Sequence, residues 1–448
     1  MAPRISVVIP VYNGGDFLRQ CLESLAQSAE RPFETIVIDD GSTDDSVKIA
    51  KEFGVTVLST EGRCGPARAR NIGAKVANGD VLFFVDSDVC VYPETLSSIA
   101  IEFTRDPKVD AIMGSYDRWP SAQNFMSQYR NLMHHYVHQQ SKRDATTFWA
   151  GCGSIRRNVF MEFGGFDEMY RSPAIEDIEL GYRLAAAGRK LILCSNIQVK
   201  HLKRWGLRST IKTDFFYRAL PWSELTLQSG SMPNDLNLRI SQRISVALVC
   251  VLGLLGAYLA ISRGVYFLLP LFATFFILLS YYWLDGSKGK SRAVMSLMVV
   301  VMAAIAVFAY VFHMLLIIAM VALAWLALFA RHRYAYPYSV WHRWTGTVIG
   351  IYCLMAIGMI WIYLPMHPLG TAFLIVLLTL IMLNKHFYLF LAGERGKMFA
   401  LAAIPFHLLY FLFSAAAFML ALIRHRLGMI EKPTAIRPEA SKAKVTTP

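Results

Sequence analysis

The sequence has few charged residues and no closely paired cysteines. Only 17% of its 448 residues are Asp, Glu, Lys or Arg, whereas 55% are hydrophobic, a balance that argues against a single soluble core. Its seven cysteines stand singly, without a C-x-x-C pair, which argues against a disulfide framework or a cysteine-based zinc site. We therefore expect the cysteines to be reduced thiols. We also expect the chain to form two domains of different composition.

The few charges that are present are mostly positive, with a formal net charge of +13. The Lys and Arg residues sit largely beside apolar stretches, and they form no stripe interleaved with aromatic side chains of the kind that binds nucleic acid. We predict that these basic residues interact with the surface of the lipid bilayer and not with nucleic acid.

A long apolar run is missing from the start of the chain. Met-Ala-Pro-Arg leads directly into Ile5–Val11, which is too short for the core of a signal peptide and lacks a cleavage site. We expect the first domain to stay in the cytosol.

Long apolar stretches are concentrated in the second half. Polar residues and Gly dominate up to about Arg239, whereas aliphatic residues and Phe dominate from Ser245 to Ile423. About 20 apolar residues are needed to span a bilayer, and Ala293–Ala330 is too long for one helix, so a hairpin near His313 is expected. The candidate spans are Ser245–Ile261, Val265–Leu284, Ala293–Val311, Met314–Ala330, Thr347–Leu364, Leu369–Leu383 and Ala400–Ile423.

The loops between these stretches differ in charge. Ser287–Arg292, Arg331–Arg343 and Lys385–Lys397 are basic, and basic loops face the cytoplasm. The pattern predicts a multi-pass protein of the inner (plasma) membrane whose first domain is cytoplasmic. A single final pass would place the basic end of the chain outside, so either the stretch with Pro405 and His407 is re-entrant or the number of spans differs from seven.

These changes in composition divide the chain into four expected parts. Residues 1–211 form an α/β domain, 212–244 an interfacial amphipathic segment, 245–427 an all-α membrane domain of about six or seven helices, and 428–448 a disordered tail. Lys212–Leu227 mixes aromatic side chains with cations, which suits the headgroup region of a bilayer. The alternative for this segment is a helix packed on the sheet.

Short β-branched runs alternate with helical patterns in the first domain. Ile5–Val11, Thr35–Ile38, Val55–Leu58 and Val81–Val85 predict strands, each followed by an amphipathic segment. This alternation is typical of βαβ units, so a Rossmann-like, mostly parallel sheet is expected. Ligands of such sheets bind outside the carboxyl ends of the strands, where this chain carries polar and acidic residues.

Several of these positions carry groups that suit a nucleotide. Tyr12 can stack on a flat base, and Asp39-Asp40 can accept from base N–H groups or ribose hydroxyls. Gly65-Pro66 opens a helix with Arg68 and Arg70 near its start, where the helix N-terminus and the fork-shaped guanidinium donors both suit phosphate. Each feature also has a structural alternative. Tyr12 is an aromatic residue of a common kind at a strand end, the loop after Asp40 can cap the next helix, and Arg68 and Arg70 can form ion pairs on the surface.

The strongest local signal is the apolar strand Val81–Val85 followed by Asp86-Ser87-Asp88. It delivers two carboxylates, separated by one small residue, to the carboxyl end of a strand. Mg²⁺ and Mn²⁺ are commonly held by one or two such carboxylates together with substrate phosphates. The pair is therefore a candidate site for a metal-bound nucleoside diphosphate.

Taken in order, these motifs resemble the family-2 glycosyltransferases of the GT-A fold, from about Arg4 to His201. The resemblance implies a UDP- or GDP-linked sugar donor and a D-x-D motif whose Asp88, with Asp86, holds Mg²⁺ or Mn²⁺. His201 is a further candidate metal ligand or a structural histidine. The residues assigned to the nucleotide sugar are Pro10, Tyr12, Asn13, Asp40, Arg68, Arg70, Asp86, Ser87 and Gly151.

Later motifs resemble the parts of the family that surround the reacting sugar. Trp149–Gly153 and Gly164–Glu168 are similar to its donor-sugar and acceptor-side loops, and Glu176-Asp177 is similar to its E-D motif. An inverting transfer needs a carboxylate that removes the proton of the acceptor hydroxyl. The resemblance assigns this role to Asp177 and a supporting or acceptor-binding role to Glu176. The alternative is that the two acids only stabilise the helix, because negative side chains interact favourably with the N-terminal end of the helix dipole.

The acceptor is not fixed by the resemblance. No Q-x-x-R-W sequence follows the E-D motif. Ser241–Ser245 resembles the Q-x-x-R-W sequence only weakly. A single transfer to a lipid-linked or other membrane acceptor, in cell-envelope glycan synthesis, is therefore favoured over a processive polysaccharide synthase. A transporter with a nucleotide-binding regulatory domain is disfavoured because the spans contain few charged residues, and a binding module without catalysis is disfavoured by the intact acids.

Overall fold

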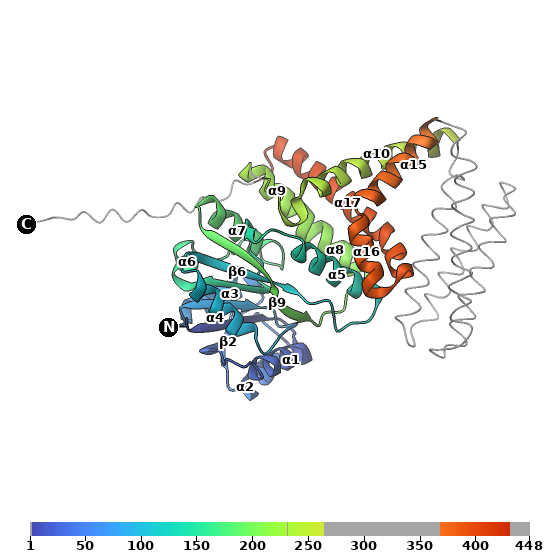
Figure 1. The fold of residues 1–448 in the computed structure, drawn as a ribbon. Helices are drawn as coiled ribbons and strands as arrows, with labels where there is room; N and C mark the ends of the chain where they lie inside the picture. The colour runs from blue at the N-terminus through green and yellow to red at the C-terminus, as the bar shows by residue number, and fades with distance from the viewer. Residues whose placement is uncertain (1, 231, 264–367, 431–448) are drawn as a thin grey trace, which may run out of the picture. The chain divides into compact units, whose positions relative to one another are not determined.

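A computed structural model of the chain describes residues 2–230, 232–263 and 368–430 (Figure 1). The chain divides into two compact units. The first, here called the sheet unit, comprises Met1–Ala122, Arg130–Arg239 and Ala416–Pro448. The second, here called the helical unit, comprises Gln123–Tyr129 and Ile240–Ala415. Each unit is described by itself.

The sheet unit is built around one nine-stranded sheet. Its strands follow the order β3-β2-β1-β4-β8-β6-β9-β5, with β7 paired to β9. The strands are β1 (Ile5–Val11), β2 (Glu34–Asp39), β3 (Thr56–Ser59), β4 (Val81–Val85), β5 (Val89–Val91), β6 (Val109–Tyr116), β7 (Asp144–Ala145), β8 (Cys152–Arg156) and β9 (Lys190–His201). The four strands predicted from the sequence are present as β1 to β4.

The expectation of a mostly parallel sheet is wrong for the second half of this sheet. Strands β1 to β4 pair in parallel, as βαβ units require. Strand β8 runs antiparallel to both β4 and β6, and β5 and β7 run antiparallel to β9, whereas β6 and β9 pair in parallel. Gly153 and Ser154 weaken the β-pattern of β8, so the sequence does not reveal a strand that is inserted between two others by tertiary pairing. The domain is a GT-A-like mixed α/β fold.

Helices cover both faces of the sheet because successive strand residues point to opposite sides. In β1, Val7 and Ile9 face a core that includes residues of α1 (Gly15–Ala26), α2 (Ser46–Glu52) and α4 (Thr95–Arg105). Val8 faces the opposite core, which includes residues of α3 (Pro66–Val76), α6 (Arg157–Glu162) and α7 (Glu176–Ala186). In β4, Phe83 and Phe84 are fully buried on these two faces, and truncation of either to Ala should cost about 3–5 kcal/mol.

The segment predicted to lie at the bilayer surface is helical and packs partly on the sheet unit. It runs through α8 (Leu207–Lys212), a π-helical turn η1 (Thr213–Ala219) and α9 (Leu220–Ser229). Trp222 Nε1 lies 3.2 Å from the hydroxyl of Tyr182, and the buried Leu225 contacts the same cluster. Phe216 is 57% exposed. Part of α9 therefore packs against α7, and the contact of this segment with lipid stays a prediction.

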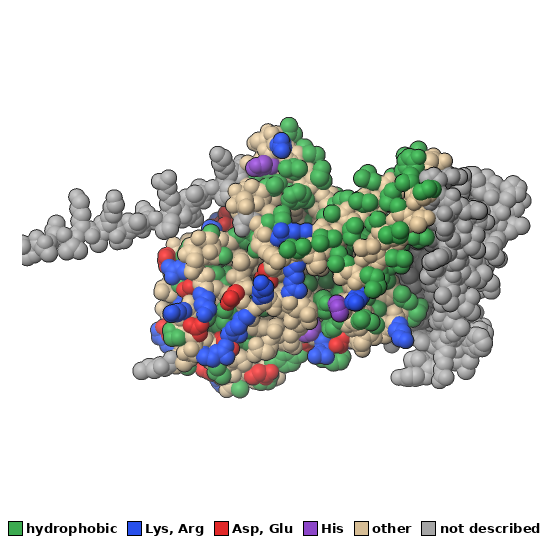
Figure 2. Space-filling view, turned by 45° about the horizontal axis from the view of Figure 1, so that its top comes forward, with side chains coloured by type: hydrophobic (Ala, Val, Ile, Leu, Met, Phe, Trp, Pro, Cys, Tyr) green, Lys and Arg blue, Asp and Glu red, His purple; other side chains and the backbone are tan. Residues whose placement is uncertain are grey.

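The helical unit is described only in part. Its helices are α10 (Ile240–Arg263), α15 (Pro368–Leu383), α16 (Lys385–Arg395) and α17 (Lys397–Arg426), the last of which ends in the sheet unit. Ile240–Leu259 and Lys397–Arg426 are each long and apolar enough to cross a membrane, and α15 with α16 form a third candidate that is bent by 62°. Hydrophobic side chains cover most of the visible surface of these helices (Figure 2).

Two details of the described helices bear on the expected loops and on the open alternatives for the last span. Lys385–Lys397 was expected to be a basic loop, but it forms α16, because Phe387, Tyr388 and Leu391 give it an apolar face that is buried. Pro405 lies inside the continuous helix α17 and does not interrupt it. The predicted spans between Val265 and Leu364, the loops Ser287–Arg292 and Arg331–Arg343, and the tail after Ile430 lie outside the described residues.

Candidate active site

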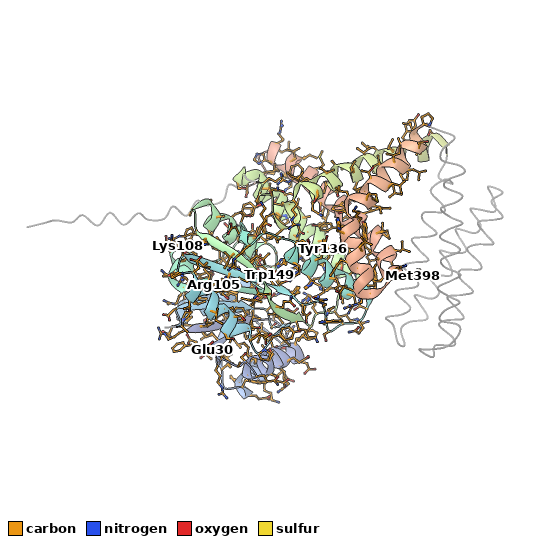
Figure 3. The ribbon with its side chains drawn as sticks, viewed as in Figure 1. Glu30, Arg105, Lys108, Tyr136, Trp149 and Met398 are labelled. Carbon is orange, nitrogen blue, oxygen red and sulfur yellow. The ribbon has the colours of Figure 1, made fainter. Side chains whose placement is uncertain are left out.

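A cavity of about 340 Å³ opens in the sheet unit beyond the ends of β4 and β9. Its walls come from α5 (Phe125–Gln139), α7, the loop before β8 and the π-helical turn η1. Figure 3 labels Trp149, which lies in the interior of this unit, whereas Glu30 and Lys108 lie at its periphery. The volume falls in the range of small-molecule sites, roughly 300–1,000 Å³.

Arg70 links the two acidic motifs across this cavity. Helix α3 begins after Gly65, whose φ of 97° and whose close approach to the backbone of Arg171 leave no room for a side chain. One turn later, Arg70 Nη2 donates to Asp86 Oδ1 at 2.6 Å and Nη1 donates to Glu176 Oε1 at 2.9 Å. The guanidinium is buried, and such a buried charge is stable only when it is paired. Arg70 therefore fixes the distance between the D-x-D turn and α7.

Asp177 is held against the loop that precedes β8. Its Oδ2 accepts from the backbone N–H of Ala150 at 2.9 Å. Gly181, one turn further along α7, lies so close to the backbone of Thr147 that a Cβ atom would collide with it. Burial raises the pKa of Asp177 to about 7, and the charge of Glu176 adds to the effect. A carboxyl with this pKa can exchange a proton near neutral pH, as a general base must.

Asp88 sits in a different electrostatic environment. Burial acts to raise its pKa, but the imidazole of His201 and the ammonium of Lys203 outweigh this and lower the pKa of Asp88 below its usual value. Asp88 Oδ2 lies 3.7 Å from His201 Nε2, because the pairing of β5 with β9 places Val89 opposite His201. Asp88 therefore stays ionised at neutral pH, whereas Asp177 gains and loses its proton in that range.

The donors of the D-x-D turn fit a divalent cation that shares its ligands with a substrate. Asp86 and Asp88 both line the cavity, and 35% and 21% of their side chains are exposed. Within the described residues, no three His, Cys, Asp or Glu side chains form a metal-binding group by themselves. Two carboxylates with room beside them suit Mg²⁺ or Mn²⁺, which take their other ligands from phosphate and water. His201 is within reach of the same position.

The loop after β1 is locked to the loop after β2. Asn13 adopts a positive φ of 49°, its N–H donates to Ser42 Oγ at 2.9 Å, and its Oδ1 accepts from the N–H of Thr43 at 2.8 Å. Tyr12 is 40% exposed, and the guanidinium of Arg63 lies 4.2 Å from the centre of its ring. An exposed ring with a cation on its face is suited to stacking.

Asp40 is buried, and its carboxylate accepts hydrogen bonds from nearby residues of the same domain. Its Oδ1 accepts from Thr60 Oγ1 at 2.9 Å and from the N–H of Cys64 at 2.8 Å, and its Oδ2 accepts from the N–H of Gly65 at 2.9 Å. These bonds hold the segment that leads into α3. A contact of Asp40 with a nucleoside stays a prediction, beside this structural role.

The structure brings together about half of the residues singled out in the sequence. Those that line the cavity are Arg70, Asp86, Asp88, Gly151, Glu176, Asp177 and His201. Those that do not line it are Pro10, Tyr12, Asn13, Asp40, Arg68 and Ser87. Arg68 is exposed on α3, and the guanidinium of Arg70 is already bonded to two acids, so a phosphate role for either stays a prediction.

The cavity also contains residues that sequence reasoning misses. Asn131, His134 and His138 reach it from α5, and Thr147 reaches it from the loop before β8. The spacing of the three α5 residues places them on one helix face, and this is visible in the sequence. Nothing in the sequence tells what that face is packed against.

The sequence of the sheet unit matches a known family. Residues 6–164 match the family described as glycosyl transferase family 2. The N-terminal domain belongs to this glycosyltransferase family. The match includes the D-x-D turn and the loop with Trp149, and it ends before the E-D motif of α7.

Individual relatives of this glycosyltransferase domain share parts of it. An uncharacterized glycosyltransferase, YibD of Escherichia coli K12, is 44% identical over 106 residues, which are 22% of this chain and 31% of that protein. The O-antigen chain rhamnosyltransferase RfbN of Salmonella typhimurium is 25% identical over 234 residues, 49% of this chain and 74% of that protein. The chain thus spans about a third of the length of YibD.

Among solved structures, the mannosyltransferase PcManGT from Pyrobaculum calidifontis, in complex with GDP-Man and Mn²⁺, is similar to this chain. The two are 17% identical with a TM-score of 0.42, and the alignment covers 80% of this chain and 86% of that one.

Proposed function

We propose that this protein is a membrane glycosyltransferase that moves a sugar from a UDP- or GDP-linked donor to a membrane-associated, lipid-linked acceptor, with inversion at the sugar carbon. The observation that carries the proposal is the position of Asp177. Its carboxyl, with a pKa of about 7, faces the same cavity as the ionised Asp88 and is joined to the D-x-D turn through Glu176 and Arg70.

The reaction needs one proton transfer and one displacement. The ionised carboxylate of Asp177 accepts the proton of an acceptor hydroxyl while that oxygen forms a bond to the anomeric carbon. The bond from this carbon to the diphosphate breaks, and its electron pair leaves with the nucleoside diphosphate. Attack opposite the leaving group inverts the configuration. The N–H of Ala150 holds one oxygen of Asp177 in place, so the proton is received at a fixed position.

A divalent cation fits the leaving-group side of this cavity. Asp86 and Asp88, with His201 as a candidate third ligand, would hold Mg²⁺ or Mn²⁺ there. When bound, such an ion neutralises the negative charge that grows on the leaving diphosphate. The salt bridge from Arg70 orients Asp86 toward this site. Lys203 lines the same region and adds a positive charge that suits a diphosphate.

The membrane-associated acceptor is supported by the helical unit and by the relatives. Two described helices are long and apolar enough to cross a bilayer, which would keep the cavity near lipid-linked substrates. RfbN is named for rhamnosyl transfer to the O-antigen chain. The poly(ribitol-phosphate) beta-glucosyltransferase of Bacillus spizizenii, 34% identical over 119 residues, is named for glucosyl transfer to poly(ribitol-phosphate). Both names support a role in cell-envelope glycan synthesis.

The proposal is tested by incubating membranes that contain the protein with a panel of radiolabelled UDP- and GDP-sugars, with and without Mn²⁺. We expect label from one donor to enter the organic phase with the wild-type protein, and label to stay in the aqueous phase with Asp177→Asn. Label that enters a water-soluble polymer would favour a polysaccharide synthase. Transfer at the wild-type rate by Asp177→Asn would contradict the assignment of the base.

A further inference from the structure

One wall of the cavity is formed by a single face of α5 together with the loop before β8. Asn131, His134 and His138 line the cavity from the helix, and Thr147 and Trp149 line it from the loop. The ring of Trp149 lies 4.6 Å from that of His134 and 5.4 Å from that of His138, centre to centre. These five residues are called the α5 wall below.

Three polar atoms of the α5 wall have no hydrogen-bond partner among the described residues. They are Asn131 Oδ1, His134 Nδ1 and Thr147 Oγ1. Asn131 and Thr147 are only 2% and 4% exposed, so bulk water does not readily satisfy them. The amide of Asn131 donates through Nδ2 to the carbonyl of Asp117 at 2.6 Å, which fixes its orientation. Buried polar atoms without partners are rare, and such atoms on a cavity wall are suited to a bound ligand.

The two histidines of the α5 wall are neutral. Burial lowers the pKa of His138 to about 4, and burial together with neighbouring His138 lowers the pKa of His134 well below its usual value. His138 donates through Nδ1 to the carbonyl of Gly114 at 2.9 Å, which leaves Nε2 as an acceptor. The wall therefore presents uncharged donors and acceptors beside aromatic rings.

Positive charge lies on other parts of the cavity lining. Arg130 is paired with Asp214 at 2.5 Å, and Lys203 lies 4.6 Å from the ring centre of Trp205. Arg218 comes from η1 and is exposed. The α5 wall itself contributes no formal charge, although the charge of Arg218 acts on both of its histidines. The hydrogen-bonding groups of the wall are therefore neutral.

The α5 wall borders the proposed base. Ala150, which donates its N–H to Asp177, directly follows Trp149, and Gly181 of α7 is packed against the backbone of Thr147. A ring that lies on Trp149 would thus have its edge near Asp177. The donor diphosphate is expected beside Asp86 and Asp88. Tyr116 lies between this position and the wall, with its ring centre 4.7 Å from that of Trp149 and 4.4 Å from that of His201.

We propose that the α5 wall binds a neutral sugar ring of the acceptor, so that the reactive hydroxyl belongs to a glycan or a glycolipid and not to a lipid phosphate. This inference rests on the proposed function and narrows it. The C–H face of a sugar packs on Trp149. Its hydroxyls donate to Asn131 Oδ1, accept from Thr147 Oγ1 and bond to His134 Nδ1. A sugar offers this mixture of an apolar face and neutral hydroxyls, whereas a phosphate offers only acceptors and charge.

The test measures nucleotide release by the full chain in detergent micelles, from whichever UDP- or GDP-sugar it turns over. The acceptor probes are neutral methyl and octyl glycosides of glucose, mannose and rhamnose in one arm, and a polyprenyl phosphate in phospholipid vesicles in the other. We compare the wild type with Thr147→Val and His134→Phe, which remove polar atoms at nearly constant volume. Gln140→Ala is the control, because Gln140 is exposed near the end of α5 and does not line the cavity.

We expect a glycoside to stimulate release, and each wall variant to raise the KM for that glycoside about tenfold, the effect of one lost hydrogen bond. The KM for the nucleotide sugar should change less than about threefold, and Gln140→Ala should behave as wild type. Stimulation by polyprenyl phosphate but by no glycoside would overturn the inference and leave the proposed function standing, as would a rise in the donor KM alone. Absence of release from every nucleotide sugar would contradict the proposed function itself.

Discussion

Two aspartates of the sheet unit, Asp40 and Asp177, follow similar sequence patterns but sit in opposite surroundings. Both oxygens of Asp40 are occupied by N–H and O–H groups of its own chain, and Asp40 lines no part of the cavity. Asp177 accepts backbone bonds from Ala150 and Ile178, yet it lines the cavity and has a pKa of about 7. Both carboxylates accept hydrogen bonds within the chain, so the difference that matters for chemistry is that Asp177 faces the cavity and Asp40 does not.

The largest effect that this comparison predicts is for Asp177→Asn. The amide keeps the shape of the side chain but cannot accept a proton, so kcat should fall about 10³-fold while the nucleotide sugar still binds. Turnover and donor binding, measured on the same preparation, check this. Asp16→Asn, on the exposed first turn of α1, is the matched control and should keep wild-type turnover. A donor affinity that falls in parallel with kcat would argue against a role confined to proton transfer.

A smaller loss is expected for Asp88→Asn, which removes charge from the D-x-D turn. We expect turnover to fall about 10²-fold, and a higher Mn²⁺ concentration to be needed for half of the remaining activity. A Mn²⁺ titration of the wild type beside the variant measures both quantities. An unchanged activation curve would show that Asp88 holds no metal.

The comparison predicts a different kind of effect for Asp40→Asn. Replacing one oxygen by an NH₂ group leaves buried N–H donors of Cys64 or Gly65 without an acceptor, which should lower the stability by about 2–3 kcal/mol. The variant should unfold at a lower temperature than the wild type in thermal denaturation. If Asp40→Asn keeps its stability but loses donor affinity, the nucleoside role predicted from the family resemblance would be favoured instead.

The smallest predicted effect concerns the loop that carries Trp149. In Gly181→Ala the new Cβ would collide with the backbone of Thr147, so the loop must shift and Asp177 loses its fixed position. We expect kcat/KM to fall about tenfold. Gly253→Ala, on α10 with open space around it, is the control and should leave kcat/KM unchanged. Equal rates for both variants would mean that the loop position does not matter for turnover.

The sequence predicts the parallel half of the fold and the acids of the site. The strands β1 to β4 are apolar and β-branched, and the acids that line the cavity stand at strand or helix ends, where a change from apolar to polar residues makes them visible in the sequence. These acids are Asp86, Asp88, Glu176 and Asp177. The antiparallel half is not predictable, because β8 owes its place to pairing with β4 and β6 and not to its own composition.

The contacts between distant segments are also beyond sequence reasoning. The double salt bridge of Arg70 joins residues that are 16 and 106 positions away, and a helix-start arginine suggests phosphate more readily than carboxylates. The face of α5 with His134 and His138 becomes meaningful only once Trp149 is seen beside it.

The pH dependence of kcat/KM tests the central claim, that Asp177 is the base of a glycosyl transfer, most directly. Because the base must be ionised, protonation below its pKa removes activity, so kcat/KM should fall about tenfold per pH unit below roughly pH 7. The residual activity of Asp177→Asn should lack this acidic limb. A wild-type profile that is flat from about pH 5 to 8, or the same limb in Asp177→Asn, would contradict the account.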